Sequence, residues 1–326
     1  MEPIRWGILS TGGIAAAFVR GLRQLPDAAV AAVGSRTAAA AEAFGAEHGI
    51  PRRHGSYEAL AADPEVDVIY VATPHNLHAA NVRLCLEAGK AVLCEKPFTV
   101  NAAEAAAVVA LARERGLFLM EAMWTRFRPH MVELRRMLAA GAIGEPRLVR
   151  ADYGFRSPFN PGHRLFAREL AGGALLDVGV YPVSFVHMVL GAPEQVVSAA
   201  HLGETGVDEQ MAAILSYPGG RQAVVTAATR TLSPRGAVVA GTEGYITIEN
   251  PWYPPSAMTL HRPEQEPLRV ELPPGDGGLS VQAAEVHRCL RAGLTESATM
   301  PLDESVAVMT TLDRIRAPWG LRYPGE

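Results

Sequence analysis

Short apolar runs alternate with helical patterns from Ile4 to Glu121, and glycine, proline or a capping residue marks each change of period. Strands that are apolar on both faces and separated by helices are typical of a covered parallel sheet. We expect strands at Arg5–Leu9, Ala28–Val33, Val66–Val71, Ala91–Cys94 and Phe118–Glu121, and helices at Ile14–Gln24, Ala38–Glu47, Leu77–Glu87 and Ala102–Arg115. The pattern predicts a doubly wound, Rossmann-type α/β domain over residues 1–124.

After Trp124 the pattern becomes that of an α+β domain, over residues 125–326. Helices are predicted at His130–Ala139, Gly173–Leu190, Val281–Arg291 and Asp303–Arg314, and strands at Pro146–Phe155, Gln210–Thr229 (a hairpin), Tyr245–Glu249, Met258–Arg262 and Leu268–Leu272. Successive strands indicate an open, mainly antiparallel sheet. Because these helices are too few to cover both faces of such a sheet, we expect this domain to form a homo-oligomer.

Composition and charge narrow the class of partner. The net charge of the 326-residue chain is −4 and no basic block is present, which argues against a nucleic-acid or membrane partner and favours a small molecule. Three cysteines without CxxC spacing indicate reduced thiols in a cytoplasmic protein. We see no leader, no long apolar run and no metal-ligand spacing, so neither a membrane span nor a metal is predicted.

The first predicted strand ends in a glycine-rich turn. Ser10-Thr11-Gly12-Gly13-Ile14-Ala15 stands where a G-x-G-x-x-G/A dinucleotide-binding turn belongs, with Ser10 in place of the first glycine. The N-terminus of the helix that follows offers free N–H groups to a pyrophosphate. An ordinary strand-to-helix turn is the alternative. The position of the glycine-rich turn directly after the first strand favours the dinucleotide site.

The second predicted strand ends in Gly34-Ser35-Arg36-Thr37, without the carboxylate that commonly binds the ribose 2′-hydroxyl of NAD. An arginine next to a hydroxyl suits a 2′-phosphate, so Ser35 and Arg36 favour NADP over NAD. The alternative for Arg36 is a solvated residue at a helix start.

Two further loops follow buried strands, at the sheet edge where ligands bind in open α/β folds. One is Ala72-Thr73-Pro74-His75-Asn76-Leu77-His78 and the other is Glu95-Lys96-Pro97. We expect both to border the nicotinamide end of the cofactor. A lysine at the end of a buried strand is uncommon unless it is paired, so Lys96 either is oriented by Glu95 or faces the substrate. For the two histidines, capping and packing are alternatives to ligand contact.

In the second half, Asp177 and Tyr181 lie four residues apart and share one face of the predicted helix. If this face borders a cleft, Tyr181 is a candidate proton donor and acceptor, and a cation such as Lys96 would lower its pKa from about 10. The alternative is a core tyrosine with a solvated hydroxyl.

These motifs in this order resemble the Gfo/Idh/MocA oxidoreductase family over nearly the whole chain. The block Met120-Glu121-Ala122-Met123-Trp124-Thr125-Arg126-Phe127, together with Tyr181 where most relatives have histidine, resembles the branch of dimeric dihydrodiol dehydrogenase and NADP-dependent D-xylose 1-dehydrogenase. Ser10 also occurs in that branch. The resemblance implies hydride transfer between NAD(P) and a sugar or cyclic diol, with Lys96 and Tyr181 at the reacting oxygen. It further implies a homodimer that pairs through the C-terminal sheet.

On this basis Asp177 is expected to position the substrate or the tyrosine. Candidate pocket residues are Trp124, Arg126, Asp152, Phe155 and Arg164, with Trp124 and Arg126 also candidates for cofactor contact and packing as the alternative for all five. A non-catalytic NADP-binding sugar sensor of the same fold is the alternative function. Aldoses, trans-dihydrodiols, anhydrosugars and inositols all remain candidate substrates.

Overall fold

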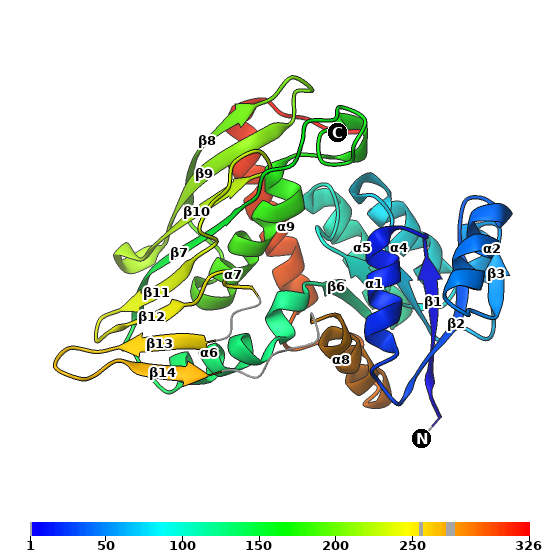
Figure 1. Ribbon diagram of the computed structural model, residues 1–326, viewed down its shortest axis with the longest axis horizontal. Coiled ribbons are helices and arrows are strands. Elements are labelled where there is room, and N and C mark those ends of the chain that lie inside the picture. Colours follow the sequence, from blue (N-terminus) through cyan, green and yellow to red (C-terminus); the bar gives the residue numbers. More distant parts are fainter. Residues whose placement is uncertain (1, 254–256, 272–277) are drawn as a thin grey trace. The chain divides into compact units, whose positions relative to one another are not determined.

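The computed structural model describes residues 2–253, 257–271 and 278–326, which form two compact units (Figure 1). The first unit holds residues 2–124 and 278–306, and the second holds 125–271 and 307–326. The chain therefore leaves the first unit after Trp124 and returns to it before α8. Within α9 (Leu302–Arg316) it passes to the second unit again.

A six-stranded parallel sheet with the order β3-β2-β1-β4-β5-β6 forms the centre of the first unit. Its strands are β1 (Ile4–Leu9), β2 (Ala28–Gly34), β3 (Arg52–His54), β4 (Val68–Val71), β5 (Ala91–Glu95) and β6 (Leu119–Ala122). Its helices include α1 (Gly13–Leu22), α2 (Ala38–Glu47), α3 (Tyr57–Ala61), η1 (His75–Leu77), α4 (His78–Glu87) and α5 (Ala102–Arg115). Strand order reverses where β1 lies beside β4, and nucleotides bind at such a switch point. The predicted Rossmann domain is confirmed.

Side-chain caps fix several of these helices. Thr37 accepts the backbone N–H of Ala40 at the start of α2, and Asn101 accepts that of Glu104 at the start of α5. The α5 helix ends at Gly116, which has a φ of +62°. Because glycine has no Cβ, it adopts this left-handed conformation without strain.

The sequence patterns missed β3 and α3. Strand β3 is only three residues long and reads Arg-Arg-His, so it carries no apolar period. It pairs with β2 at one edge of the sheet, where the backbone hydrogen bonds decide the structure.

The helix α8 (Leu279–Arg291) belongs to the first unit, although the sequence division after residue 124 assigned it to the second. It packs on α1, and Gly21 favours the close approach, since a Cβ there would lie 3.2 Å from Cβ of Leu279, which is a tight contact. The indole N–H of Trp6 donates to Nε2 of the buried His287 at 2.9 Å. These contacts join residues far apart in sequence, which no local pattern reveals.

The second unit is built on an eight-stranded sheet with the order β14-β13-β12-β11-β7-β10-β9-β8. Its strands are β7 (Pro146–Gly154), β8 (Gln195–Leu202), β9 (Asp208–Ser216), β10 (Gln222–Ala228), β11 (Ala237–Gly241), β12 (Tyr245–Ile248), β13 (Ala257–His261) and β14 (Leu268–Glu271). All neighbours pair antiparallel except β7 and β10. The predicted open, mainly antiparallel sheet is confirmed. The sequence reading missed β8 and β11, and the predicted strand end at Leu272 lies outside the described residues.

Helices cover one face of this sheet: α6 (Pro129–Ala139), a π-helical turn η4 (Leu175–Gly179) continued by α7 (Val180–Leu190), and the second part of α9 (Figure 1). The segment Arg168–Leu190 is long and apolar enough to cross a membrane, with a mean hydropathy of 1.5, although the sequence reading saw no such run. However, 89% of its most apolar stretch is buried inside the protein, as in a core helix. On the opposite face of the sheet, no helix of the described residues is present (Figure 1).

Candidate active site

The glycine-rich turn joins β1 to α1 at the switch point of the first sheet. Ser10 has a φ of +97°, so it occupies the conformation that the missing glycine would favour, at a cost on the order of 1 kcal/mol. A Cβ added to Gly12 or Gly13 would meet no atom within 4 Å. Packing within the protein therefore does not require these glycines. Open space over backbone at a helix N-terminus suits a pyrophosphate, with Thr11 and the 41% exposed Ile14 beside it.

Arg36 follows β2 at the same edge of the sheet. The Ser35 amide donates to the carbonyl of His54 on β3 at 3.1 Å, which fixes the start of the loop. Arg36 is exposed, and its guanidinium makes no hydrogen bond or ion pair with the residues that the structure describes. It is thus available to an anionic ligand.

The loop after β4 is tied to the loop after β5 through His78. This histidine is fully buried, and its ring nitrogens lie 2.9 Å from the carbonyl oxygen of Thr73 and 2.8 Å from that of Pro97. Burial lowers its pKa, although both carbonyl contacts oppose this shift. Contact with a cofactor, which the sequence predicted for His78, would require the ring to leave these carbonyls. The two carbonyl contacts are those of a packed core histidine, and a cofactor contact for His78 stays a prediction.

The other predicted residues of this loop differ in how deeply their side chains are buried. Thr73 and His75 are buried, Pro74 is half-buried and Asn76 is exposed. The amide of Asn81 donates to the Thr73 hydroxyl at 3.1 Å and thereby orients it.

Lys96 is half-buried at the carboxyl end of β5. Glu95 before it is 5% exposed, accepts a short hydrogen bond from the Tyr70 hydroxyl, and accepts the backbone N–H of Lys96 at 3.2 Å. The Glu95 carboxylate therefore fixes the backbone that carries the lysine, while orientation of the lysine side chain by Glu95 stays a prediction.

In the second unit, the helix formed by η4 and α7 carries Asp177 and Tyr181. Both are buried, and Oδ1 of Asp177 accepts a hydrogen bond from Nη1 of Arg164 at 2.5 Å. Two of the predicted substrate residues are therefore brought together as an ion pair. Arg164 remains half exposed, so this pair has access to solvent.

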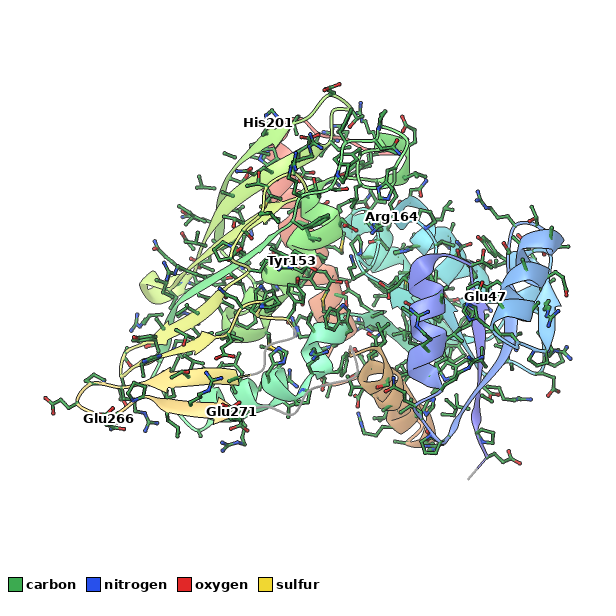
Figure 2. The ribbon with its side chains drawn as sticks, viewed as in Figure 1. Glu47, Tyr153, Arg164, His201, Glu266 and Glu271 are labelled. Atoms are coloured by element: carbon green, nitrogen blue, oxygen red, sulfur yellow. The ribbon has the colours of Figure 1, made fainter. Side chains whose placement is uncertain are left out.

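Sequence reasoning missed the aromatic surroundings of Tyr181. The ring of Tyr153 on β7 stacks on that of Tyr181, with a centroid distance of 5.4 Å and an interplanar angle of 17°. Tyr253 stacks on the other side of Tyr153 at 4.5 Å and 11°. The Arg235 guanidinium donates to the Tyr253 hydroxyl at 2.9 Å. Burial, followed by the hydrogen bond with Tyr253, raises the pKa of Tyr153 well above its usual value, so Tyr153 stays neutral. Figure 2 labels Tyr153 and Arg164.

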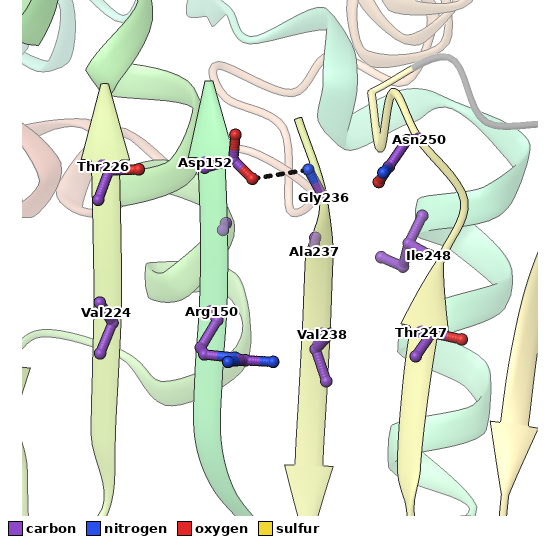
Figure 3. A pocket seen from close by; sticks show the side chains of 11 residues that line it. Arg150, Asp152, Val224, Thr226, Gly236, Ala237, Val238, Thr247, Ile248 and Asn250 are labelled. Carbon is purple, nitrogen blue, oxygen red and sulfur yellow. Dashed lines mark hydrogen bonds between the residues drawn. The ribbon is translucent and has the colours of Figure 1, made fainter. Parts of the chain in front are cut away.

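Asp152 is not brought together with Tyr181. Neighbouring residues in a strand point to opposite faces, so Tyr153 lies under α7 whereas Asp152 lies on the open face of the sheet. Its carboxylate accepts the backbone N–H groups of Arg235 and Gly236 at 2.8 and 2.7 Å. Figure 3 shows it at a pocket of about 370 Å³ on that face. We interpret Asp152 as the residue that holds the loop before β11.

Three predicted pocket residues remain. Arg126 is 3% exposed and donates from Nη2 to the carbonyl oxygen of Ser184 on α7 at 2.6 Å, and a ligand contact for it stays a prediction. Trp124 and Phe155 are half-buried, at the end of the first unit and directly after β7. A ligand contact for these two stays a prediction. Among the described residues, no group of three metal-ligating side chains is present.

Comparison with known proteins decides the family. A model described as an oxidoreductase family with an NAD-binding Rossmann fold matches residues 4–123, and a model of the Gfo/Idh/MocA C-terminal domain matches residues 131–247. The chain belongs to the Gfo/Idh/MocA oxidoreductase family. Its Rossmann domain is the NAD(P)-binding domain of that family.

Relatives match this Gfo/Idh/MocA chain over its full length. The trans-1,2-dihydrobenzene-1,2-diol dehydrogenases of Bos taurus and Homo sapiens are each 42% identical to it, and the match covers 99% of the chain and 99% of the relative. Among solved structures, KijD10, a 3-ketoreductase from Actinomadura kijaniata in complex with NADP and TDP-benzene, has a TM-score of 0.86 at 29% identity and covers 97% of this chain and 98% of its own. An aldose-aldose oxidoreductase from Caulobacter crescentus, complexed with glycerol, has a TM-score of 0.87 at 25% identity and covers 97% of both chains.

Proposed function

We propose that this protein transfers hydride between NADP and a secondary alcohol carbon of a trans-dihydrodiol or an aldose. The observation that carries the proposal is the tyrosine stack in the second unit, where the phenol of Tyr181 ends a series of nearly parallel rings. Flat aromatic faces suit the ring of a cyclic diol or a sugar. The full-length similarity to dihydrodiol dehydrogenases supports this substrate class.

The residues of this chain divide the chemistry as follows. Tyr181 takes the hydroxyl proton of the substrate alcohol. At the same time the C–H bond at the alcohol carbon breaks and a carbonyl forms. The ammonium group of Lys96 favours the charged form of the tyrosine by Coulomb attraction. Asp177, held by Arg164, orients the substrate hydroxyls. NADP, when bound to the first unit, would supply the acceptor for this hydride.

The choice of lysine at position 96 supports a role in proton transfer. Only two of the thirty Lys and Arg residues of the chain are lysines, Lys90 and Lys96. An ammonium is a compact charge that can approach a single oxygen, whereas guanidinium is a planar fork. Arginine supplies the cation of the surface ion pairs with Asp67, Asp303 and Asp27.

Two features of the first unit support NADP as the cofactor. The open space over Gly12 and Gly13 would receive the pyrophosphate, and Arg36 would bind the 2′-phosphate.

We also propose that the protein works in the reducing cytoplasm, because its three cysteines are buried and unpaired.

A substrate panel tests the proposal. Trans-dihydrodiols, aldoses, anhydrosugars and inositols are mixed with protein and NADP or NAD, and absorbance of the reduced nicotinamide is followed. We expect reduction with NADP on at least one dihydrodiol or aldose. If NADP binds but no compound on the panel is oxidised and no corresponding ketone is reduced, the non-catalytic sensor becomes the better reading.

We further propose that the open sheet face pairs with a second copy of this chain. Register places Val238, Arg150, Val224, Ile214 and Val197 in one row across five strands on that face. Val197 and Ile214 are 68% and 47% exposed, which is unusual for apolar residues on a wide sheet. An exposed apolar row of this kind fits a twofold-symmetric dimer, in which the same face of both copies meets.

Ile214→Glu is expected to convert the dimer to a monomer, because it would bury an unpaired charge from each copy in the interface. Sedimentation equilibrium of wild type and variant measures the change. Val132→Glu on α6 is the matched control, since Val132 is also an exposed apolar residue, at 52%. A monomeric wild type, or a dimeric Ile214→Glu, would contradict this interface.

A further inference from the structure

The helix that carries Asp177 and Tyr181 begins at a buried carboxylate from another element. The first N–H groups of a helix have no partner within it. Asp208, the first residue of β9, is 0% exposed, and its Oδ2 accepts the backbone N–H of Leu175 at 2.7 Å. The backbone N–H of Ala174 also favours the ionised form of the Asp208 carboxyl. A negative charge here stabilises the positive end of the helix dipole.

Gly173 makes this close approach possible. A Cβ at position 173 would lie 2.2 Å from Oδ1 of Asp208, far inside contact distance, and the φ of Gly173 is +117°. Both observations require glycine at this position. The turn before the helix is therefore shaped around the Asp208 carboxylate.

A second anchor comes from the C-terminal residues. The hydroxyl of Tyr323, which is 4% exposed, donates to the carbonyl oxygen of Gly172 at 2.7 Å. The amide of Tyr323 donates to Oε2 of Glu326 at 2.8 Å, and Arg316 donates to the same carboxylate. Asp208 and Tyr323 thus both contact the turn that starts the helix, next to Gly173.

We propose that Asp208 is a positioning residue for the reaction, which sets the place of Asp177 and Tyr181 through the N-terminus of their helix. This inference rests on the proposed function. Asp177 and Tyr181 lie in the first two turns after the cap, so a small shift of the helix start moves both. Misplacement of a reacting group by about 1 Å can lower a rate on the order of 100-fold.

The charge state of Asp208 gives the role a measurable signature. Burial raises the pKa of its carboxyl to about 7, against the favourable effects of the Leu175 and Ala174 amides. The titratable or charged side chains that act on it and on the neighbouring phenol are Arg316, Tyr323, Glu326 and Arg168. Above pH 7 the ionised carboxylate accepts both amide N–H groups, and below it the protonated group is a weaker cap.

Stability and activity then depend on pH in opposite directions. The folded pKa lies above the ordinary 3.8, so the neutral acid is the form that the fold favours. The contribution of the neutral Asp208 carboxyl to the free energy of unfolding is fully present below about pH 4 and is lost as the pH rises toward 7. Activity, which needs the ionised cap, rises over the upper part of the same range.

The test compares Asp208→Asn with wild type from pH 5 to 9. At pH 8 we expect kcat to fall about 10- to 100-fold with the Kd for NADP within about twofold, since the cofactor turn is in the first unit. The ionisation near pH 7 should disappear from the kcat profile of the variant. Hydrogen exchange at residues 174–181 should accelerate. Tyr323→Phe, which removes one hydroxyl, should lower kcat less and keep the ionisation.

Asp63→Asn is the matched control. Asp63 is a buried carboxylate that accepts the Glu65 amide at 2.9 Å, but it lies in the first unit. This variant should lose stability while keeping kcat and its pH profile. An Asp208→Asn enzyme with wild-type kcat and profile overturns the proposal, even if its stability has changed. Exchange needs no turnover, so unchanged exchange at 174–181 overturns the cap even where the assigned reaction is wrong.

Discussion

Tyr181→Phe is expected to lower kcat by about 10²- to 10⁴-fold, because it removes the hydroxyl that exchanges a proton with the substrate. The ring remains, so the stack on Tyr153 and the fold should persist. Steady-state kinetics on the best substrate of the panel give kcat, and fluorescence of bound NADPH gives the cofactor Kd. The Kd should be unchanged.

Lys96→Met should cause a loss of similar size, since it removes the cation that favours the tyrosinate. Lys90→Met is the matched control. Nζ of Lys90 donates to the carbonyl oxygens of Asp63 and Val66 at 2.6 and 2.8 Å, so this variant should lose stability and keep kcat. Rates near wild type in both Tyr181→Phe and Lys96→Met, with NADP still bound, would remove the assigned chemistry.

Arg36→Ala is expected to weaken NADP binding about 10- to 100-fold and to leave the Kd for NAD nearly unchanged. A hydrogen bond to a charged group contributes roughly 1.5–3 kcal/mol, and only NADP carries the 2′-phosphate that Arg36 would meet. Titration of both cofactors at two ionic strengths measures the effect.

Arg20→Ala is the control for general electrostatics, since it removes the same charge from the far end of α1. It should leave the ratio of the two Kd values as in wild type. Equal losses for NADP and NAD in Arg36→Ala would mean that Arg36 does not select the cofactor.

The parts of the fold that could be predicted from sequence are those with a local period. Buried strands such as β4 and β5 are apolar throughout, and α5 carries both of its end signals, Asn101 and Gly116. Strand β3 has neither period nor apolar residues. The place of α8 is set by contacts with Trp6 and Gly21, more than 250 positions earlier in the chain. No spacing rule reports such a contact.

Some residues of the candidate site could likewise be placed from the sequence, and others could not. Ser10, Arg36 and Lys96 follow strands directly, so their place at the sheet edge follows from the topology. Asp152 was predicted for the pocket and lies on the other face, because strand alternation reverses the side at every residue. Tyr153, the neighbouring residue, has the place beside Tyr181. Asp208 lies 33 positions from Leu175, and its role depends on tertiary packing alone.

The return of α8 to the first unit means that the nucleotide-binding half of the molecule is discontinuous in the gene. A ribosome that has made β1 through β6 has not yet made the helix that covers Trp6 and Gly21. The larger part of the second unit, residues 125–271, is therefore synthesised before the first unit can be completed, and the last part of the second unit, residues 307–326, follows only after that. A fragment that stops after Trp124 would expose the surface of α1 that α8 covers, and truncations meant to isolate the nucleotide-binding domain should instead splice residues 278–306 back onto it.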